Sequence, residues 1–279
     1  PVRKFVKLRH ERYSDLDTYF RALGLVCQDR QVDFVDGTMF EAHELYLTTG
    51  KCVDRAEWLS DYTYRHIYYR SIQQKAVDYL TIHDYLWRWD TDWFWCSKHF
   101  FVQHPVVRWL WGRKRLCSRV YWKLRSRFNR SPLAQRVAKA LTGRQEAVIQ
   151  DVEIPLEHAA EFARFFNREI GITPVWICPV MAYDPSALYP LYPMTHGKLY
   201  INFGFWDAVS TDHEDGYFDR KVEAKVRELQ GKKSLYSNAY YSREAFWQLY
   251  NEPAYRALKA RYDPTAKLKD LYEKCVLKQ

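Results

Sequence analysis

AVIQDVEIPLEHAAEFARFFNRE, residues 147–169, is the stretch that decides the fold. We expect its first part, Ala147–Ile154, to form a strand. Pro155 is favoured at the first position of a helix, and we expect that helix to run to Glu169. Two further strands are expected downstream, at Pro174–Val180 and Lys198–Phe205. The stretch therefore opens a strand-helix-strand-strand unit.

The same order of elements occurs once before this stretch. We expect a strand at Arg3–Arg9, a helix at Ser14–Asp29, and strands at Val32–Met39 and Leu45–Cys52. Two such units predict an α+β protein, in which two half-sheets form one antiparallel sheet with helices on one face. Residues 81–145 stand between the units as a helical insert. The expected domains are 1–80 (first half of the sheet), 81–145 (aromatic and basic insert) and 146–279 (second half and C-terminal helices).

The segment LYSNAYYSREAFWQLY, Leu235–Tyr250, predicts a strand that leads into a helix beginning near Arg243. Alternation along a strand Leu235–Tyr241 would place Tyr236, Asn238 and Tyr240 on one face. We interpret this face as the wall of a small-molecule site, and these three residues as candidates for handling a proton. The alternative is that they are amphipathic aromatic and polar residues packed at a sheet edge. Helices near 213–230, 243–250, 253–262 and 266–275 complete the expected elements.

Glycine is scarce, with 10 residues in a chain of 279. The closest pair, Gly197 and Gly204, is too widely spaced for GxGxxG or for a phosphate-binding P-loop. A nucleotide or flavin would therefore be held by a different polypeptide segment. The chain also starts with PVRKFVKLRHERY and without an initiator Met, which we interpret as a fragment of a longer protein.

No run of 18 apolar residues occurs, so no transmembrane helix is expected. The 6 cysteines are scattered, without CxxC spacing or a nearby histidine cluster. We expect reduced thiols, no metal site and a cytoplasmic protein, with peripheral membrane attachment left open.

The net charge of +9 comes entirely from the insert. Residues 93–145 hold 13 Lys and Arg and no Asp or Glu, whereas the rest of the chain carries 30 Lys and Arg against 34 acids, a net charge of −4. The same residues include ten aromatic side chains, counting Trp, Tyr and Phe. Basic and aromatic residues together suit the anionic surface of a bilayer, where Trp lies at the headgroup level.

Two other interpretations of the insert compete with the membrane. Basic grooves with stacking aromatic rings also bind single-stranded nucleic acid, and a solvated helical hairpin with an aromatic core needs no ligand. We favour the membrane over nucleic acid because the aromatic residues lie among aliphatic ones in FFVQHPVVRWLWG, residues 100–112. A nucleic-acid partner is therefore not predicted.

Four segments in this order resemble the C-terminal, substrate-facing cap half of the Δ24-sterol reductase (diminuto-like) family, which belongs to the vanillyl-alcohol-oxidase class of flavoproteins. They are FVKLR (5–9), IHDYLWRWDTDWFW (82–95), VWICPV (175–180), and LYSNAYYSREAFWQLY with the following NEPAYRALKARYDP (235–264). The resemblance covers nearly the whole chain. It implies an FAD-dependent oxidoreductase whose N-terminal half holds FAD, while this chain covers the flavin and forms the substrate cavity.

Hydride transfer between the flavin and a bulky apolar substrate, such as a sterol or another lipid, is the activity that the resemblance implies. The substrate-binding candidates are Tyr85, Arg88 and Trp95 in the aromatic segment, Trp176 and Cys178 in VWICPV, and Tyr241. For Cys178 the alternative is an inert buried thiol, and for the charged residues of the aromatic segment it is ordinary ion pairing. A function of another class also remains, a non-enzymatic module that binds lipid or a membrane surface.

Overall fold

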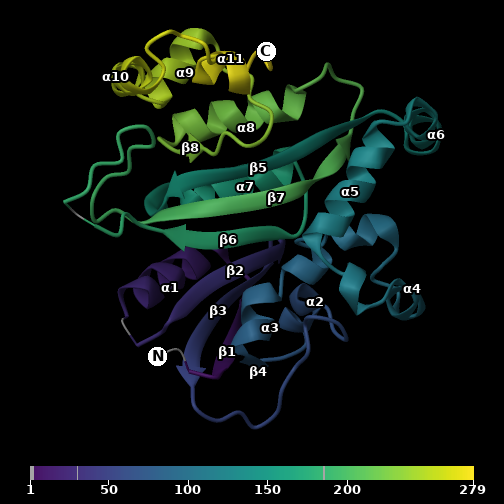
Figure 1. Ribbon diagram of the computed structural model, residues 1–279. Helices are drawn as coiled ribbons and strands as arrows, with labels where there is room; N and C mark the ends of the chain where they lie inside the picture. Colours follow the sequence, from purple (N-terminus) through teal and green to yellow (C-terminus); the bar gives the residue numbers. More distant parts are fainter. Residues whose placement is uncertain (1–2, 30, 185) are drawn as a thin grey trace. The chain divides into compact units, whose positions relative to one another are not determined.

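A computed structural model describes residues 3–29, 31–184 and 186–279, and the chain divides into two compact units, residues 1–145 and 146–279 (Figure 1). Within these described ranges each unit contributes four strands, and in each unit a helix follows the first strand. The chain is therefore an α+β protein with antiparallel strand pairing, as the sequence predicts.

In unit 1 the strands lie in the order β4-β1-β3-β2. The central strands β1 and β3 pair antiparallel in an unbroken register from Phe5 opposite Val53 to Tyr13 opposite Leu45. β4 pairs with the other edge of β1, and β2 pairs with β3. The bounds are β1 Phe5–Tyr13, β2 Phe34–Glu41, β3 Glu44–Val53 and β4 Val77–Thr81.

Helices cover both faces of the unit 1 sheet. Helix α1 (Leu16–Gln28) begins after Asp15, whose carboxylate accepts a hydrogen bond from the amide of Thr18 at 2.8 Å. A Cβ at Gly37 of β2 would lie 1.9 Å from the Tyr19 hydroxyl, so α1 packs on the face of Gly37. Asp36 points to the opposite face, where α2 (Tyr68–Ile72) and α3 (Ile82–Trp87) lie. The expectation of helices on one face is therefore wrong for this unit.

The remaining residues of unit 1 form short helices around a small aromatic core. Tyr121 is fully buried, and its ring stacks at 5.5 Å from Phe100 and 6.2 Å from both Trp93 and Trp111. Its hydroxyl donates to the carbonyl of Thr91 at 2.8 Å. The elements are η1 Asp90–Asp92, η2 Cys96–Phe100, α4 Pro105–Trp111, η3 Arg113–Arg115, α5 Ser118–Asn129 and α6 Pro132–Thr142.

In unit 2 the strands lie in the order β6-β7-β5-β8. Helices α7 and α8 follow β5 and β7, which gives the β-α-β-β-α-β order of a ferredoxin-like unit. Phe162 and Phe166 of α7 pack against Phe203 and Phe205 of β7 at 4.8 and 4.4 Å between ring centroids. The bounds are β5 Gln145–Pro155, η4 Leu156–His158, α7 Ala159–Glu169, β6 Val175–Val180, β7 Tyr200–Ser210, α8 Tyr217–Glu228 and β8 Lys232–Lys233.

Three helices end the chain and form their own apolar cluster. Phe246, Trp247 and Tyr250 are buried against Tyr241 and Tyr272. Asp270 and Glu273 form a reciprocal capping box at the start of the last helix. The bounds are α9 Arg243–Leu249, α10 Glu252–Tyr262 and α11 Leu271–Cys275.

Two further elements differ from the sequence expectations. The segment Leu235–Tyr241 is not a strand, because β8 ends at Lys233 and the chain then turns. Pro155 is the last residue of β5, and a short 3₁₀ turn precedes α7. Among the described residues, no helix combines the length and the apolar composition that crossing a bilayer requires.

Candidate functional site

One face of the unit 2 sheet is lined by polar and aromatic side chains. The amide of Asn202 on β7 donates to Asp151 on β5 at 3.0 Å, so these two side chains share a face. On β6, Cys178 stands opposite Asn202 and Trp176 opposite Gly204 in the antiparallel register, which places both on that face. Helices α7 and α8 cover the other face, which carries Phe203 and Gln150. We name this surface the polar face; it comprises Asp151, Glu153, Trp176, Cys178, Asn202 and Trp206.

Asp151 is the centre of a chain of hydrogen bonds on the polar face. The Tyr236 hydroxyl donates to its Oδ2 at 2.7 Å, and the Trp206 indole N–H donates to the Tyr236 hydroxyl at 3.0 Å. Burial raises the pKa of Asp151, and the hydrogen bonds from Tyr236 and Asn202 counteract only part of that shift. Burial, together with the Asp151 charge, also raises the pKa of Tyr236. Tyr236 therefore acts here as a neutral donor.

Glu153 stands two residues further along β5 and has the more strongly shifted carboxyl. The Tyr192 hydroxyl donates to its Oε2, and the Ser234 hydroxyl donates to its Oε1 at 3.3 Å. Burial raises the pKa of Glu153 from 4.5 to about 7, opposed by the hydrogen bond from Tyr192 and reinforced by the negative charge of Asp151. A carboxyl group with this pKa can take up or release a proton near neutrality.

Gly204 allows β7 to approach this cluster closely. A Cβ at that position would lie 2.6 Å from Asp151 Oδ1 and 2.6 Å from the Trp206 ring. Any side chain would displace the carboxylate or the indole. A glycine inside a strand commonly marks such a close approach, and Gly204 is part of the site for this reason.

Four buried acids elsewhere in the chain have cationic partners, whereas buried Asp219 accepts from the neutral amide of Gln150. In the part of the chain that the structure describes, Asp151 and Glu153 instead receive hydrogen bonds from neutral hydroxyl and amide groups. Strongly shifted carboxyls without a charged partner are more typical of functional sites than of structural ion pairs. The paired acids are Asp36 with Arg88 at 2.7 Å, Asp78 with Lys75 at 3.2 Å, Asp92 with Arg108 at 2.8 Å, and Glu223 with Lys233 at 2.7 Å.

Of the three residues proposed to handle a proton, only Tyr236 lies at the polar face. The Asn238 side chain accepts from Lys278 at 2.7 Å, and its carbonyl accepts from Lys233. The Tyr240 ring covers Gly216 and stacks under the Arg220 guanidinium at 4.9 Å. Because the segment turns instead of forming a strand, the expected common face of these residues does not exist.

The residues predicted to bind substrate lie in different parts of the fold. Trp176 and Cys178 lie on the polar face, with the Trp176 and Trp206 rings 6.4 Å apart. Tyr241 is buried in the cluster of the C-terminal helices. Its pKa is raised by burial, and Lys233 lies 6.0 Å from its ring.

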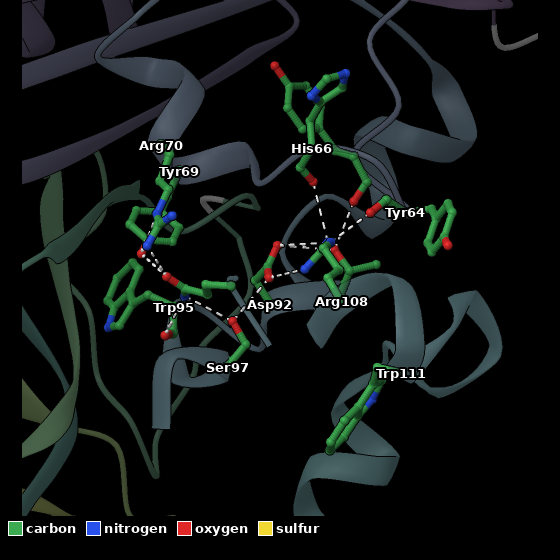
Figure 2. Close-up of polar contacts among 12 residues, drawn as sticks. Tyr64, His66, Tyr69, Arg70, Asp92, Trp95, Ser97, Arg108 and Trp111 are labelled. Carbon is green, nitrogen blue, oxygen red and sulfur yellow. Dashed lines mark hydrogen bonds and ion pairs between the residues drawn. The ribbon is translucent and has the colours of Figure 1, made fainter. Parts of the chain in front are cut away.

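The three candidates from the aromatic segment lie in unit 1 and are packed in its interior. Arg88 donates to Asp36 and to the Tyr85 carbonyl, and its guanidinium lies 3.9 Å from the Tyr85 ring centroid. Trp95 is fully buried, and its carbonyl accepts from Gln103 at 3.1 Å (Figure 2). These contacts give all three residues a role in packing.

Sequence reasoning missed four residues of the polar face, Asp151, Glu153, Asn202 and Trp206, and two residues beside it, Tyr192 and Gly204. A signal for the first two was present, because alternation along β5 sends Asp151 and Glu153 to the face opposite the apolar Val152 and Ile154. No such pattern points to Tyr192, which comes from the long connection between β6 and β7.

The residues of the polar face form one wall of the candidate site. Two surface depressions stand out, one of about 500 Å³ beside α9 and α10 and one of about 520 Å³ beside α2 and α4. Neither is lined by a residue of the polar face. A substrate bound at this wall would need a second surface to enclose it.

Fold and site together define an α+β chain with two repeated units, one of which presents paired carboxyl groups and indole rings on an antiparallel sheet. The chain is homologous to the Delta(24)-sterol reductases, over the C-terminal half of those proteins. It is 24% identical to Delta(24)-sterol reductase of Homo sapiens over 288 residues, which cover 98% of this chain and 54% of that protein.

The homology extends to nematode and plant proteins. The Delta(24)-sterol reductase homolog of Caenorhabditis elegans is 24% identical over 295 residues, and Delta(24)-sterol reductase of Arabidopsis thaliana is 20% identical over 272 residues, or 87% of this chain. The chain spans about half the length of the curated relatives that it matches. No family model matches it. The relatives are sterol reductases, a kind of oxidoreductase.

Proposed function

We propose that this chain is the substrate-facing cap portion of an FAD-linked oxidoreductase of the Δ24-sterol-reductase kind, within the vanillyl-alcohol-oxidase class. Its substrate would be a bulky apolar molecule such as a sterol or another lipid. The observation that carries the proposal is the polar face, where Glu153 has a pKa of about 7 and no cationic partner among the described residues. The homology with sterol reductases supports the substrate class.

The residues of the polar face fit a wall over a flavin ring and not a cradle for its pyrophosphate. Trp176 and Trp206 offer flat apolar surfaces, whereas Gly204 serves strand packing and provides no phosphate loop. The FAD pyrophosphate would therefore be held by the N-terminal half of the whole protein. A bound flavin would supply or accept the hydride in a carbon–carbon double-bond reduction or its reverse.

The chain itself would manage the accompanying proton. Burial raises the pKa of Glu153 to about 7, so its carboxyl can exchange a proton near neutral pH, and the hydroxyls of Tyr192 and Ser234 orient that group. Asp151, held by Tyr236 and Asn202, adds negative charge that favours the protonated form of Glu153. Water would be excluded by the apolar substrate and by the indole rings.

Glu153→Gln in the complete, FAD-loaded polypeptide tests this proposal. Turnover of a Δ24-unsaturated sterol should fall roughly 100-fold with unchanged flavin absorbance, in line with loss of general acid catalysis. Glu157→Gln is the matched control, because Glu157 follows β5 in the sequence and is exposed and paired with Lys198. Loss of its charge should change turnover less than about twofold. Equal turnover of the two variants would exclude Glu153 as the proton-handling group.

A second candidate function is a non-enzymatic module that binds lipid or a membrane surface. The exposed aromatic and basic residues of unit 1 favour it, among them Trp109 and Trp122 at 70% and 58% exposure. The absorbance spectrum of the complete polypeptide separates the two functions. Stoichiometric flavin supports the oxidoreductase, whereas a colourless protein that binds lipid supports the module.

A further inference from the structure

Helix α4 of unit 1 buries its charged side chain and exposes apolar ones, which is the reverse of an ordinary surface helix. Its one charged side chain, Arg108, is 5% exposed, whereas Val106, Trp109 and Leu110 are 57%, 70% and 67% exposed. A surface helix normally turns its apolar side chains towards the core and its charges towards water. The apolar face of α4 is therefore presented outward.

Arg108 fixes α4 in this orientation (Figure 2). Its guanidinium donates to Asp92 Oδ1 at 2.8 Å and to the Tyr64 carbonyl at 2.7 Å. Asp92 also accepts from Ser97 at 3.0 Å, and Ser97 accepts from Gln103 at 2.9 Å. Turning α4 to bury Trp109 would carry Arg108 towards solvent and leave Asp92 buried without its cation, which is costly. The exposure of the apolar face is thus built into the packing of the unit.

Positive charge surrounds the exposed apolar side chains. The exposed residues Arg113, Lys114 and Arg115 form η3, immediately after α4, and residues 93–145 contain no acid. The depression between α2 and α4 reaches Trp109, and its lining includes Arg65, Arg70 and Lys75 but, among the described residues, no carboxylate side chain. The patch is therefore both apolar and cationic.

We propose that α4 and η3, residues 105–115, dock this chain on an anionic lipid bilayer. Trp109 and Leu110 would enter the boundary between headgroups and acyl chains, and Arg113–Arg115 would contact the lipid phosphates. Exposed aliphatic side chains such as Val106 and Leu110 match acyl chains but contribute nothing to the base stacking that holds single-stranded nucleic acid. The bilayer is thus the partner that both the charges and the apolar residues fit.

Vesicle co-sedimentation tests the proposal without any enzymatic readout. The chain should pellet with phosphatidylcholine vesicles that contain phosphatidylserine, and binding should weaken steeply as salt is raised. Trp109→Ser with Leu110→Ser should reduce the partition coefficient more than about tenfold. Replacing Arg113, Lys114 and Arg115 by Gln should reduce it by roughly 100-fold.

The control variant is Tyr183→Ser with Leu188→Ser, which removes two side chains of 96% and 82% exposure from unit 2, outside the basic segment 93–145 of the sequence. It should bind like the unmodified chain. Equal pelleting with neutral and anionic vesicles, no pelleting, or equal binding by the α4 variant would each overturn the proposal. The proposal would also be overturned if the chain pelleted without vesicles and the α4 variant abolished that pelleting. This result would assign the apolar face of α4 to contact with a second copy of the chain. Binding to a single-stranded oligonucleotide in the absence of vesicle binding would assign it to nucleic acid.

Discussion

The interior of unit 1 around Asp92 and the polar face of unit 2 bury acidic side chains in opposite ways. In unit 1, Asp92 lies in the interior with both oxygens bonded to the Arg108 guanidinium, and Ser97 satisfies it further. In unit 2, Asp151 and Glu153 are half-buried on the polar face and receive hydrogen bonds only from neutral groups among the described residues. The carboxyl groups of both regions are removed from water, but the first has a cationic partner and the second has neutral hydrogen-bond donors.

This difference separates a structural role from a functional one. An acid paired with arginine holds elements together through its ion pair, and the guanidinium opposes the rise that burial causes in the pKa of Asp92. An acid that has only neutral donors lacks this opposing charge and can exchange a proton near neutrality if burial raises its pKa far enough. Glu153, with a pKa of about 7, is of the second kind. The same carboxylate chemistry thus stabilises α4 in unit 1 and provides a candidate acid in unit 2.

The largest expected effect comes from breaking the ion pair of unit 1. Arg108→Met should destabilise the chain by about 3–5 kcal/mol, because it leaves Asp92 buried without its cation. Urea unfolding measures this, and Arg119→Met, at an exposed position of α5, is the control with an expected change of less than about 0.5 kcal/mol. Adding Asp92→Asn to Arg108→Met should recover part of the loss, and equal stability of R108M and R119M would show that the pair is dispensable.

A smaller effect is expected from crowding the polar face. Gly204→Ala should cost about 1–3 kcal/mol, because its Cβ would lie 2.6 Å from Asp151 Oδ1 and from the Trp206 ring. Thermal unfolding measures the cost, and tryptophan fluorescence should shift with it as the indole moves. An unchanged unfolding temperature with an unchanged emission spectrum would contradict the prediction, because it would mean that β5 and β7 accommodate the added Cβ without cost.

The repeated strands and main helices could be predicted from the sequence, but several local features could not. The expected strand Ala147–Ile154 and the helix expected after Pro155 correspond to β5 and α7, each of which buries one face against its own unit. The prediction of a strand at Leu235–Tyr241 was wrong. Its aromatic residues favour strands, but β8 has only two residues, and the chain then turns towards α9. In unit 1 the helices were expected on one face because the sequence does not show that Arg88, at the end of α3, pairs with Asp36 on the face opposite α1.

The candidate site was predicted only in part. Tyr236, Trp176 and Cys178 do lie on the polar face, whereas Asn238, Tyr240 and Tyr241 point to other partners. The pairing of Glu153 with Tyr192 joins residues 39 positions apart and depends on the path of a long connection. Such contacts follow from tertiary packing and leave no local pattern in the sequence.

The polar face should also give stability a characteristic pH dependence. The pKa of Glu153 is raised to about 7 in the folded chain from 4.5, so the folded state binds more protons between these values and stability falls as pH rises through that window. Glu153→Gln should therefore stabilise the chain by about 1–2 kcal/mol at pH 8, allowing for solvent screening, and by much less at pH 5. Urea unfolding at both pH values measures the difference. Burial also raises the pKa of Asp219, to about 6, but its contribution to the pH dependence of stability is the same in the unmodified chain and in E153Q. An equal gain at both pH values would place the Glu153 pKa near its ordinary value.

The smallest expected effect distinguishes Tyr236 from Glu153. Tyr236→Phe removes the hydroxyl that donates to Asp151 at 2.7 Å, while Asn202 continues to satisfy the other oxygen. Stability should fall by about 1 kcal/mol, the usual contribution of one hydrogen bond, and the pKa of Asp151 should rise further because that bond favours the carboxylate. Turnover of the complete enzyme should fall less than about tenfold, since a phenol whose pKa is raised above its ordinary value is a poor proton donor. Steady-state rates of Y236F and E153Q, measured side by side, decide between the two groups. A loss in Y236F as large as that in E153Q would move the proton-handling role to the tyrosine and make Glu153 a positioning residue.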